Sequence, residues 1–277
     1  MQNIPRIYLN ENLELGKEYP LPPDTAHYLT KVMRVSALPK QDMDFSVFNN
    51  GKEFGAKLIE RTDGKKSVCY ALLTVGSDRI DPAGAFCLAF APIKQSRLEE
   101  MLNMATQLGV ARFQPVITER TVARHIKWER IQKIAIEASE QSGRNSIPSI
   151  LPEIKFADFI KNNKNIIFAD ERFAHDDVSF RTPQSGGPGS GQDQGIENIS
   201  DRKNICNSQP HQIPDNFAQS AQNFRDDTII LIGPEGGFSD KEFELLDVAG
   251  AAGISLGRTI LRAETAAVVA IGKIDSR

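Results

Sequence analysis

The sequence predicts an α/β protein whose mostly parallel sheet is covered by helices on both faces and preceded by a small β-rich domain. From residue 83 onward, short apolar runs alternate with segments whose apolar residues recur at helical spacing, as in a parallel sheet with crossover helices. Before residue 76, short apolar clusters recur between turn signals instead. The pattern changes at residues 77–82, where Pro82 ends a turn-prone stretch, so we expect a linker there.

Residues 1–76 are expected to form a small domain of the β-barrel type. Apolar and polar residues alternate over Asp44–Phe48, and the Asn50-Gly51 pair that follows is a hairpin-turn signal. The clusters RIYL, EFGAKLI and SVCYALLTV predict further strands. Ala26–Arg34 predicts one short helix.

Residues 83–277 are expected to form the sheet with its helices. The apolar runs predict strands over Ala85–Pro92, Arg112–Ile117, Ile166–Ala169, Thr228–Ile232 and Gly253–Leu256. Helical spacing predicts helices over Leu98–Leu108, Trp128–Gln141, a segment that ends near Ala249, and Glu264–Ile274. The third of these helices starts after Ser239, a favourable N-cap, with acidic residues in its first turn.

One segment, Arg181–Arg225, departs from this alternation. It is rich in Gly, Ser, Pro, Gln and Asn and includes SGGPGSGQDQG. Such a composition buries too little apolar surface to offset the entropy of ordering, so we expect a flexible insertion at 181–225 between two strands. A surface loop without a function of its own is the simplest interpretation.

Composition and charge exclude several classes of protein. The net charge of −3 argues against a uniformly basic nucleic-acid binder but leaves room for a local patch within Lys94–Arg144, where a solvated helix face is the alternative. Three scattered cysteines and four scattered histidines predict no disulfide framework and no metal site. Neither a membrane span nor a secretory signal is visible, so we expect a cytoplasmic protein with no membrane partner.

The strongest local motif is GPEGG at Gly233–Gly237, between the apolar run that ends at Ile232 and the N-cap Ser239. In open α/β sheets, ligands bind at the carboxyl ends of strands, and glycines let the backbone approach them closely. The spacing matches neither a P-loop nor a dinucleotide-binding motif. A ligand loop that carries the carboxylate of Glu235 is favoured over a plain strand–helix turn.

The second motif covers Leu256–Ala267. A strand ends, a charged turn follows, and a helix with small residues begins, with Arg262 and Glu264 beside its first turn. Taken alone, this pattern also suits an ordinary Arg–Glu pair at a helix N-terminus.

Together, GPEGGFSDKEFE and LG-x-x-ILR-x-ETA resemble the C-terminal signature of the RsmE family, the small-subunit ribosomal RNA uridine-N3 methyltransferases of the SPOUT class. RIYL and AHYLTKVMR resemble the family's N-terminal PUA-like domain. The blocks at 93–124 and 128–148 resemble its next two conserved blocks. The similarity covers nearly all of the chain except 181–225.

This resemblance implies a SPOUT-type sheet with a C-terminal trefoil knot, a preceding PUA-like β-barrel domain that binds RNA, and a homodimer. It implies S-adenosylmethionine as cofactor and small-subunit ribosomal RNA, within an assembled subunit, as partner. The cofactor-binding residues would be Phe168, Ala169, Asp170, Glu171, Gly233, Pro234, Glu235, Gly236, Gly237, Leu256, Gly257, Ile260, Leu261 and Thr265. In the family an arginine usually stands directly before Ile-Leu-Arg, whereas this chain has Arg258-Thr259, which shifts the arginine by one position.

The chemistry implied is methyl transfer to uridine N3. Arg262 is the candidate cation that favours the N3 anion, and Glu235 the candidate for positioning or proton acceptance. Candidate RNA-binding residues are the basic ones on both domains, which would meet phosphates: Arg6, His27, Lys31, Arg34, Lys94, Arg120, Arg124 and Arg144.

Two other functions are compatible with the motifs. The first is a SPOUT enzyme that methylates another target, such as a ribose 2′-hydroxyl. The second is an RNA-binding assembly factor that does not catalyse. A nucleotide hydrolase is disfavoured because no Lys-Ser/Thr phosphate loop is present.

Overall fold

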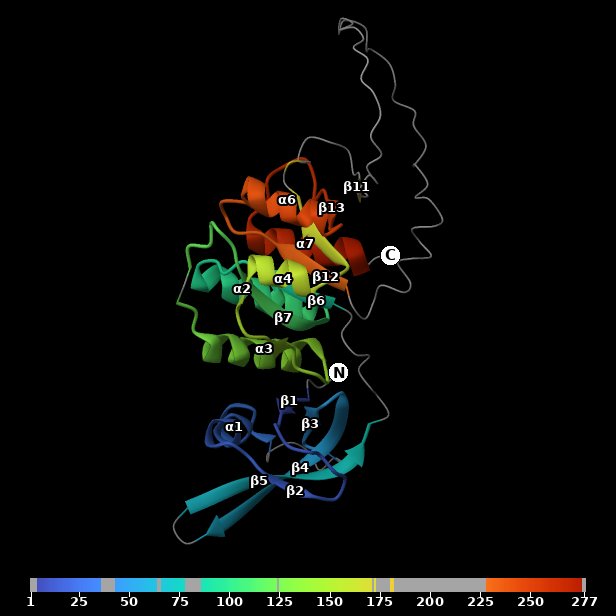
Figure 1. Ribbon diagram of the computed structural model, residues 1–277. Helices are drawn as coiled ribbons and strands as arrows, with labels where there is room; N and C mark the ends of the chain where they lie inside the picture. The colour runs from blue at the N-terminus through green and yellow to red at the C-terminus, as the bar shows by residue number, and fades with distance from the viewer. Residues whose placement is uncertain are drawn as a thin grey trace, which may run out of the picture.

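A computed structural model describes residues 4–35, 43–63, 66–77, 86–123, 125–170, 172, 180–181 and 228–275. The described chain builds two sheets, the first from residues 6–76 and the second from residues 86–254 (Figure 1). The predicted linker past Ser77 and the predicted insertion past Arg181 lie outside the described residues. Among the described helices, none is long and apolar enough to cross a membrane.

The first sheet has the order β1-β3-β4-β5-β2. Its strands are β1 (Arg6–Tyr8), β2 (Glu18–Pro20), β3 (Phe45–Asn49), β4 (Lys52–Asp63) and β5 (Lys66–Gly76). Only the β1–β3 ladder is parallel. The predicted hairpin is confirmed, because Asn50 (φ 49°) and Gly51 (φ 78°) join β3 to β4 with the positive φ angles that a two-residue turn needs.

The helix predicted over Ala26–Arg34 begins earlier and changes type. Helix α1 (Pro23–His27) starts with a proline in its first turn, where the missing N–H is not needed, and continues as one π-helical turn, η1 (Tyr28–Val32). Leu29 is fully buried and anchors this segment on the sheet's apolar face.

The second sheet has the order β11-β13-β10-β12-β6-β7-β8, and β9 also pairs with β7. Its strands are β6 (Phe86–Phe90), β7 (Val110–Ile117), β8 (Ser149–Ile150), β9 (Ile154–Lys155), β10 (Ile166–Ala169), β11 (Phe180–Arg181), β12 (Thr228–Ile232) and β13 (Ala252–Ile254). Every ladder except β11–β13 is parallel. The predicted α/β class with a mostly parallel sheet is therefore confirmed.

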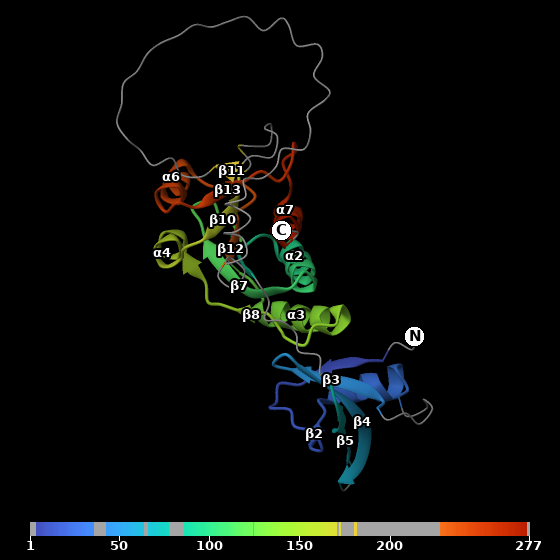
Figure 2. The same ribbon diagram turned by 90° about the vertical axis from the view of Figure 1, so that its right-hand side faces the viewer.

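Helices cover both faces of this sheet (Figure 2). The helices are α2 (Gln95–Gln107), α3 (Trp128–Ser142), α4 (Phe156–Asn162), α6 (Asp240–Val248) and α7 (Ala263–Asp275). Leu98, Met101 and Leu102 of α2 are fully buried with residues of α3 and α7 in one core, and α4 and α6 enclose a second core on the opposite face. Helices α2, α3 and α7 thus bury apolar residues at the predicted helical spacing, whereas α4 was not predicted.

The strand order determines where loops meet. Strand β12 lies between β10 and β6, and β13 lies on the far side of β10. Because these strands are parallel, the loops that follow β10, β12 and β13 leave the same edge of the sheet side by side. Helix α6 starts at that edge with Ser239 as N-cap, and the Ser239 N–H donates to Glu242 Oε2 at 2.9 Å.

Candidate functional site

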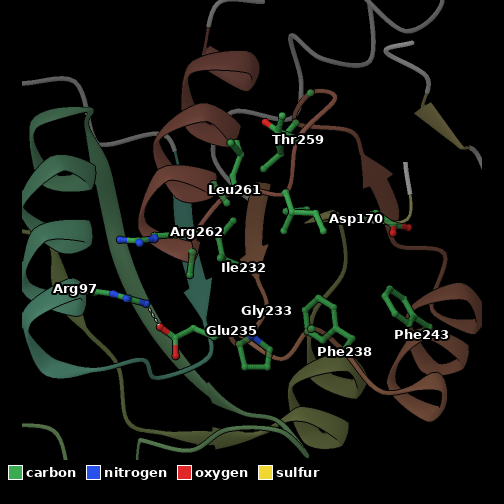
Figure 3. A pocket seen from close by; sticks show the side chains of 18 residues that line it. Arg97, Asp170, Ile232, Gly233, Glu235, Phe238, Phe243, Thr259, Leu261 and Arg262 are labelled. Atoms are coloured by element: carbon green, nitrogen blue, oxygen red, sulfur yellow. Dashed lines mark hydrogen bonds and ion pairs between the residues drawn. The ribbon is translucent and has the colours of Figure 1, made fainter. Parts of the chain in front are cut away.

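A cavity of about 310 Å³ lies at the carboxyl ends of β10, β12 and β13 (Figure 3). Its lining comes from the three loops, from α2 and from the starts of α6 and α7. The lining residues are Arg97, Ala169, Asp170, Ile232, Gly233, Pro234, Glu235, Gly237, Phe238, Phe243, Leu256, Gly257, Thr259, Ile260, Leu261, Arg262, Ala263 and Ala266.

The GPEGG loop shapes one wall. A Cβ on Gly233 would stand 3.0 Å from the Phe238 ring, so a larger residue there would push against that ring and glycine is favoured. Gly237 has φ 68°, a left-handed conformation that also favours glycine. Arg120, from the loop after β7, donates through Nη1 to Gly236 O at 2.8 Å and so fixes the loop from outside.

Aromatic rings support the inner side of the cavity. Phe238 packs edge-on against Phe243, with centroids 5.7 Å apart, and Phe168 of β10 contacts both rings from the core. Phe168 itself is 2% exposed and does not line the cavity. The resulting wall is apolar, which suits a planar heteroaromatic group.

Asp170 also lines the cavity, and its carboxylate is paired with Arg172. It is 3% exposed and accepts hydrogen bonds from Arg172 Nε at 2.9 Å and Nη2 at 2.6 Å. The Arg172 guanidinium also lies 3.8 Å from the Phe243 ring centroid, and its hydrogen bonds to Asp170 raise its pKa further above the ordinary value. A buried carboxylate that is neutralised in this way can accept hydroxyl or amino groups of a ligand.

The mouth of the cavity is charged. Arg97 Nη1 of α2 donates to Glu235 Oε1 and forms an ion pair across the mouth. Arg262 lies on the side of the cavity that faces α2, near this pair (Figure 3). Two guanidinium groups and one carboxylate leave this rim positive, as a site for a developing anion requires.

The structure brings together most of the cofactor-binding residues predicted from the sequence. Those that line the cavity are Ala169, Asp170, Gly233, Pro234, Glu235, Gly237, Leu256, Gly257, Ile260 and Leu261, and both predicted catalytic residues, Arg262 and Glu235, line it too. Gly236 packs beneath Arg120 instead, and Thr265 is exposed on α7. Glu171 lies outside the described residues.

Several lining residues were not predicted. Arg97 resembles one cation among many on a solvated helix, and Phe238, before α6, and Phe243, in α6, resemble ordinary core positions. Ile232, Thr259, Ala263 and Ala266 were noted only as parts of motifs. The family blocks contain all of these residues except Ile232, but single-residue patterns do not separate them from structural positions.

Two of the predicted RNA-binding arginines, Arg6 and Arg144, use their guanidinium groups in hydrogen bonds inside the protein. Arg6 donates to Glu53 Oε1, Ser139 O, Glu140 O, Arg144 O and Asn145 Oδ1 at 2.6–3.1 Å. Arg144 is buried and donates to Thr106 O and Val110 O, both at 2.8 Å. These arginines join the two sheets and the end of α3, where cations stabilise the last helical carbonyls.

The other predicted RNA-binding residues have different surroundings. His27, Lys31, Arg34 and Lys94 are exposed, and Arg120 is exposed while it donates to the GPEGG loop. Arg124 lies outside the described residues.

The chain is similar to known proteins over almost its whole length. Residues 81–275 match the RNA methyltransferase domain family. The ribosomal RNA small subunit methyltransferase E of Rickettsia conorii is 32% identical over 97% of this chain and 94% of its own, and that of Synechocystis is 30% identical over 90% and 70%. A crystal structure of ribosomal RNA small subunit methyltransferase E from Neisseria gonorrhoeae, bound to S-adenosylmethionine, superposes with a TM-score of 0.69 at 25% identity over 99% of this chain and 98% of that one.

Proposed function

Because the chain belongs to the family of ribosomal RNA small subunit methyltransferases E, we propose that it methylates N3 of a specific uridine in small-subunit ribosomal RNA. It is an RNA methyltransferase that uses S-adenosylmethionine. The observation that carries the proposal is the single cavity that combines an apolar aromatic wall, a buried carboxylate and a positive mouth. A methyl donor and an anionic nucleophile need these three surroundings at one place.

The proposal assigns a role to each part of the chain. Residues 1–76 would form the PUA-like RNA-binding barrel and residues 83–277 the SPOUT methyltransferase domain, with the trefoil knot at the loops that build the cavity. The active form would be a homodimer that acts on an assembled subunit in the cytoplasm. The loops after β10, β12 and β13 support this division, since they carry the family's motif residues.

The residues of the cavity fit the cofactor. Phe238, Leu256 and Leu261 offer an apolar wall to its adenine, and Asp170 offers an acceptor for hydroxyl or amino groups. Gly233 removes the side chain that would otherwise meet the Phe238 ring. When bound, S-adenosylmethionine supplies an electrophilic methyl group on a sulfonium, from which a neutral thioether leaves.

The chain's own residues would prepare the nucleophile. Uracil N3 carries a proton and lies on the base-pairing edge, so the base must be unpaired or extruded before reaction. As N3 forms its bond to the methyl carbon, the N3 proton must leave. A cation beside a carbonyl oxygen of the base favours that loss, and Arg262 at the mouth is placed for this role. Glu235 would position the base or accept the proton.

RNA would be held mainly through phosphates. The exposed basic residues Lys31 and Arg34 on the first domain, with Lys94 near the cavity, would fix the RNA in register without reading its sequence. Binding is therefore expected to weaken steeply as salt concentration increases.

The experiment is transfer of a labelled methyl group from S-adenosylmethionine to small ribosomal subunits that lack the modification, followed by mass spectrometry of the nucleosides. We expect N3-methyluridine. A 2′-O-methyl product would replace the proposed target, and no transfer together with no cofactor binding would favour the assembly-factor alternative.

A further inference from the structure

We propose that Arg97 is a catalytic residue that stabilises the uracil anion, and that Glu235 positions Arg97 rather than acting as the base. The proposal rests on the uridine-N3 reaction above. It concerns the mouth of the cavity, where Arg97, Glu235 and Arg262 meet around the position that the base would enter.

Arg97 is held on a rigid support. It lies in the first turn of α2, and the next residue, Leu98, is fully buried, as are Met101 and Leu102. The Arg97 N–H donates to Lys94 O at 3.0 Å, which fixes the backbone at the helix start. A guanidinium on such a support needs little reorganisation during a reaction, and preorganised charge is what stabilises transition states.

The side chain crosses the cavity to reach its partner. Arg97 Nη1 donates to Glu235 Oε1, which lies 138 residues further along the chain in the GPEGG loop. Nearby Glu99 of α2 already accepts from Gln95 Nε2 at 2.8 Å and lies 3.7 Å from Arg130 Nε. The Arg97–Glu235 pair therefore belongs to the cavity rather than to the ion pairs on the helix surface.

The pair is accessible to a base. The side chain of Arg97 is 35% exposed and that of Glu235 is 49% exposed, so a planar base can contact the pair from solvent. One carboxylate oxygen takes one guanidinium N–H, and a guanidinium has five N–H donors in all. The remaining donors can meet a uracil carbonyl oxygen, where negative charge collects when N3 loses its proton.

The same contact assigns Glu235 to Arg97 rather than to the N3 proton. Its Oε1 already accepts from Arg97 Nη1, and the pair spans the mouth of the cavity. The N3 proton would then pass to solvent, and the enzyme's contribution would be to lower the N3 pKa through Arg97 and Arg262. This division leaves Glu235 with the task of aiming Arg97.

The test compares Arg97→Ala and Arg97→Lys with the wild-type enzyme on small subunits, with pH varied. The wild type must form N3-methyluridine, or the proposed function itself fails. We expect Arg97→Ala to lose about a hundredfold in rate near neutral pH, to recover as pH rises, and to bind S-adenosylmethionine with wild-type affinity. We expect Arg97→Lys to retain part of the rate.

A second substrate makes the test specific. In subunits reconstituted with 5-fluorouridine RNA, the fluorine makes N3–H more acidic, so the loss in Arg97→Ala is expected to shrink. Arg61→Ala, which removes an exposed arginine on β4, serves as the control. Three results for Arg97→Ala would each overturn the inference. They are a wild-type rate, a loss of rate that is the same at every pH and on both substrates, and weakened binding of S-adenosylmethionine.

Discussion

Arginine serves two purposes in this molecule. The first is seen at the joint between the two sheets, where Arg6 of β1 meets the end of α3, and the second at the mouth of the cavity. At the joint, Arg6 is 15% exposed and gives five hydrogen bonds to Glu53 and to the end of α3. At the mouth, Arg97 is 35% exposed and donates to one carboxylate, Glu235. The joint arginine holds the protein together, whereas the mouth arginine retains donors for a substrate.

Surroundings at the joint explain why its arginine is structural. The Arg6 guanidinium lies 4.6 Å from the Phe48 ring centroid, and its acceptors include the carbonyls of Ser139 and Glu140 at the last turn of α3. Ser139 O also accepts backbone N–H groups from Gly143 and Arg144, so the Arg6 guanidinium adds a charged donor at the end of α3. Removal of such a group affects stability first, whereas removal of a mouth arginine affects turnover first.

The largest expected effect is on stability. We expect Arg6→Ala to lower the free energy of unfolding by about 3 kcal/mol, because Glu53, Ser139 O and Glu140 O each lose a charged donor. Arg61→Ala removes an exposed ion pair with Glu18 and should change the free energy of unfolding by about 1 kcal/mol or less. Urea denaturation measures the free energy of unfolding of both variants. Equal losses would contradict the claim that Arg6 is structural in a way that an exposed arginine is not.

The next effect is on turnover. Arg262→Ala is expected to reduce methyl transfer about a hundredfold while the unfolding midpoint stays at the wild-type value. The reason is loss of a cation where the N3 anion forms. Single-turnover rates on small subunits measure the effect, with Arg61→Ala as control. If the Arg262→Ala enzyme turned over at the full wild-type rate, Arg262 would have no part in the proposed mechanism.

A smaller change is expected in cofactor affinity. Asp170→Asn keeps the shape of the side chain but removes the buried charge that Arg172 neutralises, so we expect S-adenosylmethionine to bind about tenfold more weakly. Titration calorimetry measures the affinity. If Asp170→Asn binds as tightly as the wild type, this carboxylate is a structural partner of Arg172 only.

RNA affinity should change less per residue. Affinity falls as salt rises, so a plot of log affinity against log salt has a negative slope. Lys31→Ala or Arg34→Ala should each make that slope less steep by about one, since each removes one phosphate contact. Arg6→Lys should leave that slope unchanged, because Arg6 is turned into the joint. Binding to ribosomal RNA at several salt concentrations tests both statements, and a less steep slope for Arg6→Lys would place this residue on the RNA surface after all.

The smallest expected effect is a pH dependence at the joint. Burial raises the pKa of the Glu140 carboxyl, and Glu137 adds to the rise, although the Tyr8 N–H and Arg6 oppose it. A raised pKa in the folded state gives stability that is complete below the unfolded value of about 4.5 and is lost as pH rises through the folded value.

Glu140→Gln cannot ionise and still accepts the Tyr8 N–H. Relative to the wild type, its free energy of unfolding should therefore increase as pH rises from about 4 to about 7. Denaturation at each pH measures the difference. A constant difference across that range would show that Glu140 does not titrate with folding.

Sequence patterns predicted the elements but not their arrangement. Ile166–Ala169 and Thr228–Ile232 were predicted with the bounds that the structure has, because each is a short, uninterrupted apolar run. Helix α4 and the two-residue strands β8 and β9 were missed, since so few residues show no period. The insertion of β12 between β10 and β6 depends on long-range pairing, which no local pattern contains.

The site was predictable where a motif carried it. GPEGG and LG-x-x-ILR supplied most of the cavity's lining, because glycines and charges at strand ends are unusual enough to notice. The sequence could not separate Arg97 from Arg6 and Arg144, since a basic residue has the same local pattern whether its side chain is exposed or buried. Only the tertiary hydrogen bonds separate the two classes.

The central claim is that this cavity places a methyl group on the base-pairing edge of a uridine. Reverse transcription of small-subunit RNA after incubation with enzyme and S-adenosylmethionine tests it directly, because a methyl at N3 blocks pairing and stops the polymerase. We expect one cofactor-dependent stop at a uridine with the wild type and with Arg61→Ala, and a strongly reduced stop with Arg262→Ala. Labelled RNA without such a stop, or an undiminished stop with Arg262→Ala, would contradict the account.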